Sequence, residues 1–363
     1  MLKTSSIDEW DKFYKGTTTA SYFQSSGWSQ VWSRYTGGRL RPAPLVTILP
    51  SGKKVLVPLT RQRLRGGLGS LWHAAPAGTY GGWLTEPGVA LTEEELQFLI
   101  RSLFRYCGSL IFRMFPMTPV MDSNGIISNA ENLDFFADHS GLLSGISCQE
   151  DYTRLIDCSV GYDALSMGWS AGKGKMKWKI KKAVRSGVQV RKAIGEKDIA
   201  TYYRMYLDAS KRWDPPPTHV YSSSFFDLLL ESGMHSVLGK REQGTDGPCE
   251  MWVAEHDGQV IAGAIILTGN QYMSYWHGVF DPEYRAHRPV NLLLSTLIEE
   301  CCKRGLRWFD FNPSMGIESV DHFKQSFGAQ SSRCPVLKKS SGLVRAATMT
   351  GKFLRRLSKG DSG

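Results

Sequence analysis

The residues best suited to chemistry are cations gathered in one short segment. Nine basic residues and no acidic residue occur from Lys173 to Lys192. A dense run of one charge is expected where a protein meets a polyanion, such as a tRNA, a pyrophosphate or an anionic membrane. Within this run, Lys181, Lys182 and Arg185 are candidates for phosphate contacts, because ammonium and guanidinium groups donate hydrogen bonds to phosphate oxygens. The alternative is a helix face that is only solvated.

A second pair of cations follows an expected strand at Tyr272–Val279. Arg285 and Arg288 can each donate two hydrogen bonds to one phosphate. Tyr284, beside them, either hydrogen-bonds a substrate or packs against its neighbours. These three residues are candidates for a substrate or phosphate site.

Asp310 lies within an apolar segment, Trp308–Phe311, that is expected to be a strand. A buried carboxylate needs a hydrogen-bonding partner, because burial without one is costly. Asp310 is therefore either a base or orienting group in a reaction, or a carboxylate that binds the backbone of the loop before Pro313.

Two further kinds of site are disfavoured. Gly168, Ser170 and Gly172 have the spacing of the G-x-S-x-G elbow of α/β-hydrolases, but that motif needs a buried strand before the serine, and Tyr162–Met167 lacks that pattern. Ser170 is instead expected to cap or precede the basic helix. The eight histidines show no metal-ligand spacing, and the seven cysteines include no C-x-x-C pair, so we expect neither a metal site nor a disulfide framework.

Composition indicates a chain with cores of its own. The 363 residues are 42% hydrophobic and 11% aromatic, enough for about two domains. The longest apolar stretch, Val260–Leu267, is short for a bilayer, and the N-terminal segment lacks the apolar core of a secretory signal. We therefore expect a cytoplasmic protein. Its net charge is +10, and residues 331–363, with eight basic residues and one acidic residue, are expected to form a flexible tail that contacts the membrane peripherally.

The elements expected to position these residues occur twice along the chain. In the first copy a helix is predicted by apolar residues spaced i, i+3, i+4 and i+7: Trp28, Val31, Trp32 and Tyr35. A hairpin follows, and then a helix that begins with a capping box at Thr92 and ends at Gly108. The hairpin strands are expected at 45–49 and 55–59, and a further strand at 109–115.

The second copy repeats this order. A helix through Tyr202 and Tyr206 precedes a hairpin around Asp257-Gly258 and a third strand at 272–279. A helix with an apolar face and a strand at 306–311 follow. We therefore expect an α/β protein of two similar domains, each a mixed, mainly antiparallel sheet flanked by helices. Their expected bounds are 1–150 and 151–330; the second opens with a basic helix at 173–187, and the tail occupies 331–363.

Three segments of the sequence resemble a known family. The segment KGKMKWKIKKAVRSGVQVRKA resembles the R-x-x-I-R-K-A-x-x-x-G-V helix and strand of the FemABX peptidyltransferases and their BioF2-like acetyltransferase relatives in the GNAT superfamily. Residues 275–329 are similar to the C-terminal half of that family, and Thr79–Leu84 to its Tyr-Gly-Gly segment. The resemblance implies two tandem GNAT-like domains and transfer of an acyl or aminoacyl group onto an amine.

The resemblance also implies site residues. A Phe-Lys pair of the family lies beside the reacting groups, and it corresponds here to Phe323-Lys324. The cation would hold a carboxylate or stabilise an oxyanion, and the ring would pack against the donor. The alternative is a short helix with Phe323 in the core and Lys324 in water. Together with Asp310, these are the expected catalytic residues.

The donor is either aminoacyl-tRNA or acyl-coenzyme A. Ordinary GNAT domains bind the CoA pyrophosphate with a Q/R-x-x-G-x-G/A loop, whose glycines expose backbone N–H groups. Here Arg288 and Val290 replace the glycines, and Pro289 removes a donor. We therefore expect an aminoacyltransferase without a cofactor, which moves an aminoacyl group from aminoacyl-tRNA to an amine of a cell-wall precursor, small peptide or lipid-linked acceptor. The alternatives are an acyl-CoA-dependent N-acyltransferase and a non-enzymatic RNA- or membrane-binding protein.

Overall fold

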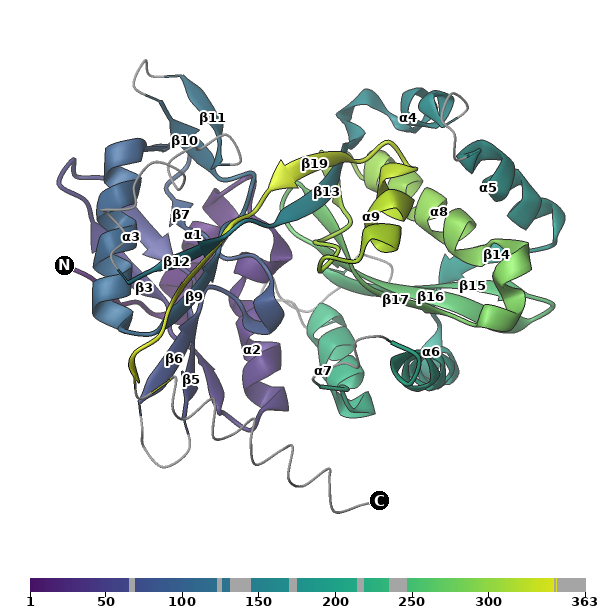
Figure 1. Cartoon of the computed structure of the whole chain (residues 1–363), viewed down its shortest axis with the longest axis horizontal. Helices are drawn as coiled ribbons and strands as arrows, with labels where there is room; N and C mark the ends of the chain where they lie inside the picture. The colour runs from purple at the N-terminus through teal and green to yellow at the C-terminus, as the bar shows by residue number, and fades with distance from the viewer. Residues whose placement is uncertain are drawn as a thin grey trace. The chain divides into compact units, whose positions relative to one another are not determined.

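The chain forms two units. The computed structural model (Figure 1) describes residues 1–64, 69–122, 126–130, 145–169, 175–213, 219–234, 247–342 and 344. Contacts divide the chain into a first unit, Met1–Asp151 with Arg333–Gly363, and a second unit, Tyr152–Ser332. Both ends of the chain therefore belong to the first unit.

The helices of the first unit are α1 (Ile7–Gly16), α2 (Ser26–Tyr35) and α3 (Glu93–Cys107). Local sequence patterns predict α2 and α3, and both form. The capping box between Thr92 and Glu95 is present, and Gly108 ends α3 with a φ of 66°, a left-handed conformation that glycine adopts without strain. These predictions are confirmed.

Strands of the first unit form three sheets. One has the order β1 (Lys3–Thr4), β3 (Leu45–Ile48), β4 (Lys54–Val57), β7 (Leu84–Thr85). The largest has the order β12 (Ser147–Gln149), β20 (Val336–Lys339), β9 (Leu110–Arg113), β6 (Ser70–His73), β5 (Thr60–Arg63), β2 (Leu40–Pro42). The third has the order β11 (Ile127–Asn129), β10 (Pro119–Met121), β8 (Leu91–Thr92).

The described strands of this unit thus form separate sheets and not the one sheet expected for the domain. The β3–β4 hairpin forms in antiparallel register, as predicted. The predicted strand at 109–115 forms as β9, which lies in a different sheet from this hairpin and pairs in parallel with β6. Four residues without a clean alternation gave β6 no sequence signal.

The expectation of a flexible tail at residues 331–363 is wrong for the first part of that segment. Two strands, β19 (Gln330–Arg333) and β20, occupy the first part of residues 331–363. Val336 and Leu337 are buried in the first unit, and β20 pairs with β9 on one side and β12 on the other. The high content of basic residues suggested a solvated tail, but Val336 and Leu337 are enough to hold a short strand in the sheet. Residues 345–363 lie outside the described part of the chain.

The second unit is built on one sheet of seven strands. Its order is β14 (Gln189–Lys192), β15 (Cys249–His256), β16 (Gln259–Thr268), β17 (Tyr272–Phe280), β18 (Trp308–Asp310), β13 (Tyr152–Asp157), β19. Asp257 and Gly258 both have positive φ, 49° and 72°, and form the predicted two-residue turn between β15 and β16. The strand β18 pairs in parallel with β17, as a strand that returns after a helix must.

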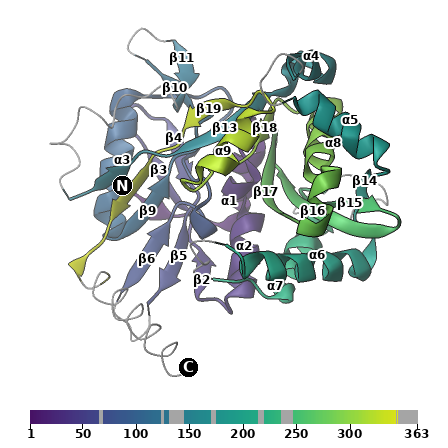
Figure 2. The same cartoon turned by 45° about the vertical axis from the view of Figure 1, so that its right-hand side comes forward.

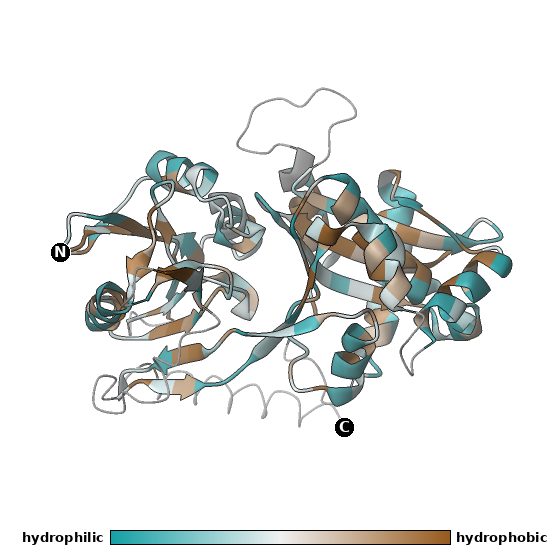
Figure 3. Cartoon of the chain, turned by 90° about the horizontal axis from the view of Figure 1, so that it is seen from above, coloured by the Kyte–Doolittle hydropathy of each residue, from teal (hydrophilic) through white to brown (hydrophobic). Residues whose placement is uncertain are grey.

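Helices cover both faces of this sheet, with α6 and α7 on one face and α8, with α5 beside it, on the other (Figure 1). The helices of the unit are α4 (Tyr162–Gly168), α5 (Met176–Arg185), α6 (Gly195–Ser210), α7 (Ser223–Met234), α8 (Pro289–Lys303) and α9 (Glu318–Gln325). The predicted apolar face of α8, through Leu294, Leu297 and Ile298, is fully buried. Figure 3 shows apolar residues, in brown, along the strands between these helices.

The G-x-S-x-G match and the membrane-spanning character of the chain remain to be compared with the structure. Ser170 and Gly172 of the G-x-S-x-G match lie outside the described residues, and the helix α4, not a strand, precedes them. Among the described residues, no helix combines the length and apolar character that a bilayer crossing requires.

Candidate active site

A separation of two strands creates the candidate site in the second unit. Parallel pairing of β17 with β18 extends only from Tyr272 with Trp308 to Ser274 with Asp310. Beyond that point β17 continues to Phe280, whereas β18 ends. Asn312 closes the end of the paired region, because its side-chain Nδ2 donates a hydrogen bond to the carbonyl oxygen of Tyr275 at 2.8 Å.

A pocket of about 460 Å³ lies beyond this separation. Three cations line it, Arg285, Arg288 and Lys324, and no carboxylate is among its described lining residues. Much of the remaining wall is aromatic or aliphatic: Trp213, Tyr275, Phe280, Leu293, Leu294, Phe311 and Phe323. Such a pocket suits an anionic group attached to a less polar one.

The arginines lie at the N-terminus of α8. Arg288 immediately precedes Pro289, the first residue of the helix, and has a left-handed backbone with φ 59° and ψ 39°. This conformation is the one that a glycine would favour, so the chain keeps the turn while a guanidinium replaces the glycine. The Nε of Arg288 is buried and has no hydrogen-bond partner among the described residues. A helix N-terminus adds its own attraction for an anion.

Lys324 is buried beside the same pocket. This residue lies on α9 and is only 5% exposed. Its Nζ donates a hydrogen bond to the carbonyl oxygen of Asn312 at 2.6 Å. The interpretation that places Lys324 in water is therefore wrong. Phe323 is half-buried, lines the pocket and packs edge-on against Phe327 at 5.5 Å between ring centroids.

Asp310 has a different position from the one a catalytic base would need. It is fully buried and is not among the residues that line the pocket. Its Oδ1 accepts hydrogen bonds from the Thr153 hydroxyl at 2.5 Å and from the backbone N–H of Asn312 at 2.8 Å. The carboxylate thus binds the loop before Pro313, the second of the two interpretations of its position in the sequence, and holds Asn312 in place.

The other candidates lie elsewhere in the second unit. The Tyr284 hydroxyl donates a hydrogen bond to Gln259 Oε1 at 3.2 Å, and Tyr284 does not line the pocket. Lys181, Lys182 and Arg185 are on α5, which contributes no residue to the pocket. The structure therefore brings together Arg285, Arg288, Phe323 and Lys324, and separates them from the other five candidates.

Tyr275 is a pocket residue that sequence analysis missed. Burial raises the pKa of its phenol to about 12, so the hydroxyl stays protonated at neutral pH and can donate a hydrogen bond. Gly278 makes room for this ring, because an added Cβ there would lie 2.0 Å from the Tyr275 oxygen. A β-bulge between β16 and β17, at Ile265 and Ile266, sets the direction of the Tyr275 side chain. No sequence pattern predicts this bulge.

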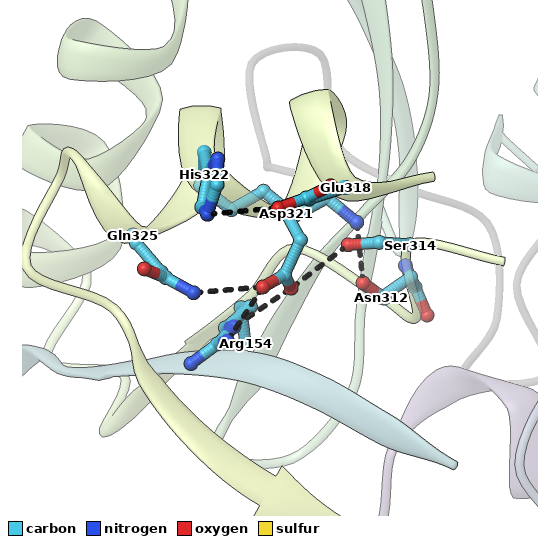
Figure 4. A network of polar contacts seen from close by, with 8 residues as sticks. Arg154, Asn312, Ser314, Glu318, Asp321, His322 and Gln325 are labelled. Atoms are coloured by element: carbon cyan, nitrogen blue, oxygen red, sulfur yellow. Dashed lines mark hydrogen bonds and ion pairs between the residues drawn. The ribbon is translucent and has the colours of Figure 1, made fainter. Parts of the chain in front are cut away.

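A polar network fixes the helix that carries Lys324 (Figure 4). Arg154, on β13, donates two hydrogen bonds to the Asp321 carboxylate, at 2.8 and 2.6 Å. Ser314 and Gln325 donate to the same carboxylate at 3.2 and 2.7 Å. These bonds, chiefly the one from Arg154, lower the pKa of Asp321 to about 2. The network therefore joins α9 to the sheet in its ionised form.

This pKa predicts a pH dependence of stability. A carboxylate whose pKa is lowered on folding stabilises the folded state above its unfolded pKa, near 3.8, and that contribution is lost as the pH falls toward about 2. In urea unfolding, Asp321→Asn should therefore be less stable than the parent at pH 6, and the difference in free energy of unfolding should shrink at pH 3. A difference that stays constant between these pH values would contradict the assignment.

The structure describes no metal-binding group. Among the described residues, no set of three or more His, Cys, Asp and Glu side chains is placed to hold a metal ion.

Known proteins resemble this chain in one domain and in overall fold. Residues 171–325, most of the second unit, match the family model described as an acetyltransferase (GNAT) domain. No curated protein matches the chain. FemX is similar in structure, with a TM-score of 0.64 at 13% identity over 93% of this chain and 96% of that one. The C-terminal domain of a protein described as a lysylphosphatidylglycerol synthetase, from Agrobacterium fabrum, has a TM-score of 0.54 at 12% identity over 96% and 97%.

At such low identities the structural likeness shows the fold alone, and it extends over nearly the whole of each chain. The family match in the second unit identifies an acyltransferase domain. The predicted α/β fold class is confirmed, and the match over residues 171–325 agrees with the predicted GNAT-type domain in the second unit.

Proposed function

We propose that the second unit transfers an aminoacyl group from aminoacyl-tRNA to an amine and so forms an amide bond. The observation that carries the proposal is the composition of the pocket at the N-terminus of α8. It offers two guanidinium groups and one ammonium group where an ordinary GNAT domain offers free backbone N–H groups. Side-chain cations of this kind suit a phosphodiester that arrives from outside the pocket.

The chemistry follows from the positions of the lining residues. Arg285 and Arg288 hold a phosphate near the 3′ end of the donor, and the aminoacyl ester extends toward Lys324 and Tyr275. The acceptor amine attacks the ester carbonyl, the new C–N bond forms, and the ester C–O bond breaks. The amine proton leaves with the ribose oxygen. Lys324 and Tyr275 donate hydrogen bonds to the oxyanion that develops on the carbonyl oxygen.

The acceptor is an amine of a cell-wall precursor, a small peptide or a lipid-linked molecule. The name of the Agrobacterium fabrum neighbour describes an aminoacylated lipid, which is in keeping with aminoacyl transfer to a membrane-associated acceptor. The apolar and aromatic part of the pocket wall suits the side chain of the transferred residue.

One observation favours a second donor. The matched family model is described as an acetyltransferase domain, and the pocket lies at the helix N-terminus where an anionic cofactor would bind. An acyl-CoA-dependent N-acyltransferase with an atypical CoA site is therefore the alternative.

Binding measurements distinguish aminoacyl-tRNA from acyl-CoA as the donor. We expect aminoacyl-tRNA with a stable amide linkage to bind at least about tenfold more tightly than the same tRNA without its amino acid, since the pocket adds contacts worth about 1.4 kcal/mol or more. Isothermal titration calorimetry at moderate salt measures both, with CoA and acetyl-CoA as the comparison. Micromolar CoA binding, together with equal affinity for charged and uncharged tRNA, would replace the proposal by its alternative.

A further inference from the structure

A basic helix face lies outside the pocket and has no role in the proposed reaction. We call it the α5 face and define it as Lys177, Trp178, Lys181, Lys182 and Arg185. The helix is fixed to α8 by its opposite side, where Met176 and Ala183 are buried. The Asn291 side chain donates a hydrogen bond to Met176 Sδ at 3.3 Å. Because residues follow one another by about 100° around a helix, Trp178 lies about 200° from Met176 and points away from the core.

The α5 face combines free cations with exposed apolar groups. None of its four cations forms an ion pair with any residue that the structure describes. Trp178 is 48% exposed, and Lys182 Nζ lies 5.5 Å from the centre of its ring.

Val184 extends this apolar character. It is 57% exposed in the structure. Val184 is about 80° around the helix from Met176 and so lies at the edge of the buried side. A tryptophan and a valine are thus exposed at the surface among lysines, and no described residue buries either side chain fully. Figure 2 shows α5 at the outer surface of the second unit, beside α8.

We propose that the α5 face docks on an anionic phospholipid bilayer. Amphipathic helices that lie in a bilayer interface carry lysine and arginine on the polar side and tryptophan or aliphatic residues at the level of the headgroups. Lysines attract anionic lipids through charge alone, without a fixed hydrogen-bonding geometry. Of the four cations of this face, three are lysines.

RNA is the competing partner, and the structure favours the bilayer. RNA contacts would use the cations, and Trp178 could stack on a base, but an exposed aliphatic side chain such as Val184 gains nothing from RNA. Burial of both apolar residues in a headgroup layer accounts for their exposure. The inference does not rest on aminoacyl-tRNA as donor, because the α5 face contributes no residue to the pocket.

Vesicle sedimentation with the full chain tests the proposal. The parent should bind vesicles of phosphatidylglycerol and phosphatidylcholine, and bind pure phosphatidylcholine weakly. Replacing Lys181, Lys182 and Arg185 together by Gln should lower the partition coefficient about a hundredfold, because each cation near an anionic surface contributes about fivefold. Trp178→Ala should lower it by about tenfold, since less apolar area enters the interface.

Matched controls are available in the first unit. Phe98 is 44% exposed, so Phe98→Ala removes a comparable exposed ring. Replacing Lys3, Arg101 and Arg105 by Gln removes the same charge from exposed positions of the first unit. Both controls should bind vesicles as the parent does. Brominated phosphatidylglycerol should quench the parent's tryptophan fluorescence more than that of Trp178→Phe.

Three results would overturn the proposal. One is equal binding of the triple variant and the parent to anionic vesicles. Another is unchanged fluorescence quenching in Trp178→Phe. The third is loss of tRNA binding in the triple variant with full vesicle binding, which would make this face an RNA surface. A failure of aminoacyl-tRNA as donor would leave the vesicle result unaffected, so the two proposals can fail separately.

Discussion

Replacing Lys324 by Met is expected to lower turnover by about a hundredfold or more, which is the cost of removing one donor from a developing oxyanion. Lys324 lines the pocket and is held there by its hydrogen bond to the Asn312 carbonyl oxygen. Methionine keeps the apolar stem and deletes the charge. Single-turnover transfer of a labelled aminoacyl group, at saturating donor, measures the effect on the chemical step.

The same change should also lower stability, because the Asn312 carbonyl oxygen loses its donor. A buried polar group left without a partner costs about 1–3 kcal/mol. Ile298→Val is the matched control: Ile298 is fully buried in the second unit, does not line the pocket, and its shortening costs about 0.5–1.5 kcal/mol. It should reduce the melting temperature and keep turnover. Full turnover in Lys324→Met would exclude Lys324 from the reaction.

Replacing Arg288 by Gly is expected to weaken donor binding about ten- to a hundredfold, since a charge-assisted hydrogen bond contributes about 1.5–3 kcal/mol. Glycine is the informative substitution because Arg288 has a φ of 59°. It accepts this backbone without strain, so the loop and the start of α8 should be unchanged. Calorimetric titration with aminoacyl-tRNA measures the loss.

This substitution also restores one glycine of an ordinary CoA loop. If acyl-CoA is the donor, Arg288→Gly should bind CoA at least as tightly as the parent does. Arg288→Lys keeps the charge but loses the two-pronged geometry, so it should retain only part of the affinity for aminoacyl-tRNA. Unchanged aminoacyl-tRNA affinity in Arg288→Gly would show that the arginine does not hold the donor.

The elements of the fold were predictable from local patterns. Apolar spacing marked α2, α6 and α8, a capping box marked the start of α3, and Asp257-Gly258 marked the turn between β15 and β16. Each of these signals depends on residues that are near one another in sequence, where the periods of helix and strand decide which side chains share a face. The two arginines of the pocket were found in the same way, because both lie between a strand and the helix that follows it.

The sequence by itself thus determined the α/β class, the order of the main helices and hairpins, and Arg285 and Arg288 of the pocket, while its family resemblance added Phe323 and Lys324. Tertiary structure alone decided how those residues are placed. Asp310 accepts a hydrogen bond from Thr153, 157 positions away, and supports the loop. Lys324 donates a hydrogen bond to the same loop, and β20 pairs with β9 across more than two hundred residues. Hydrophobic burial is not directional and leaves a periodic trace along the chain, but hydrogen bonds between distant segments depend on where the whole fold brings them together. The pocket exists because β17 and β18 separate, and no local pattern records where two strands stop pairing.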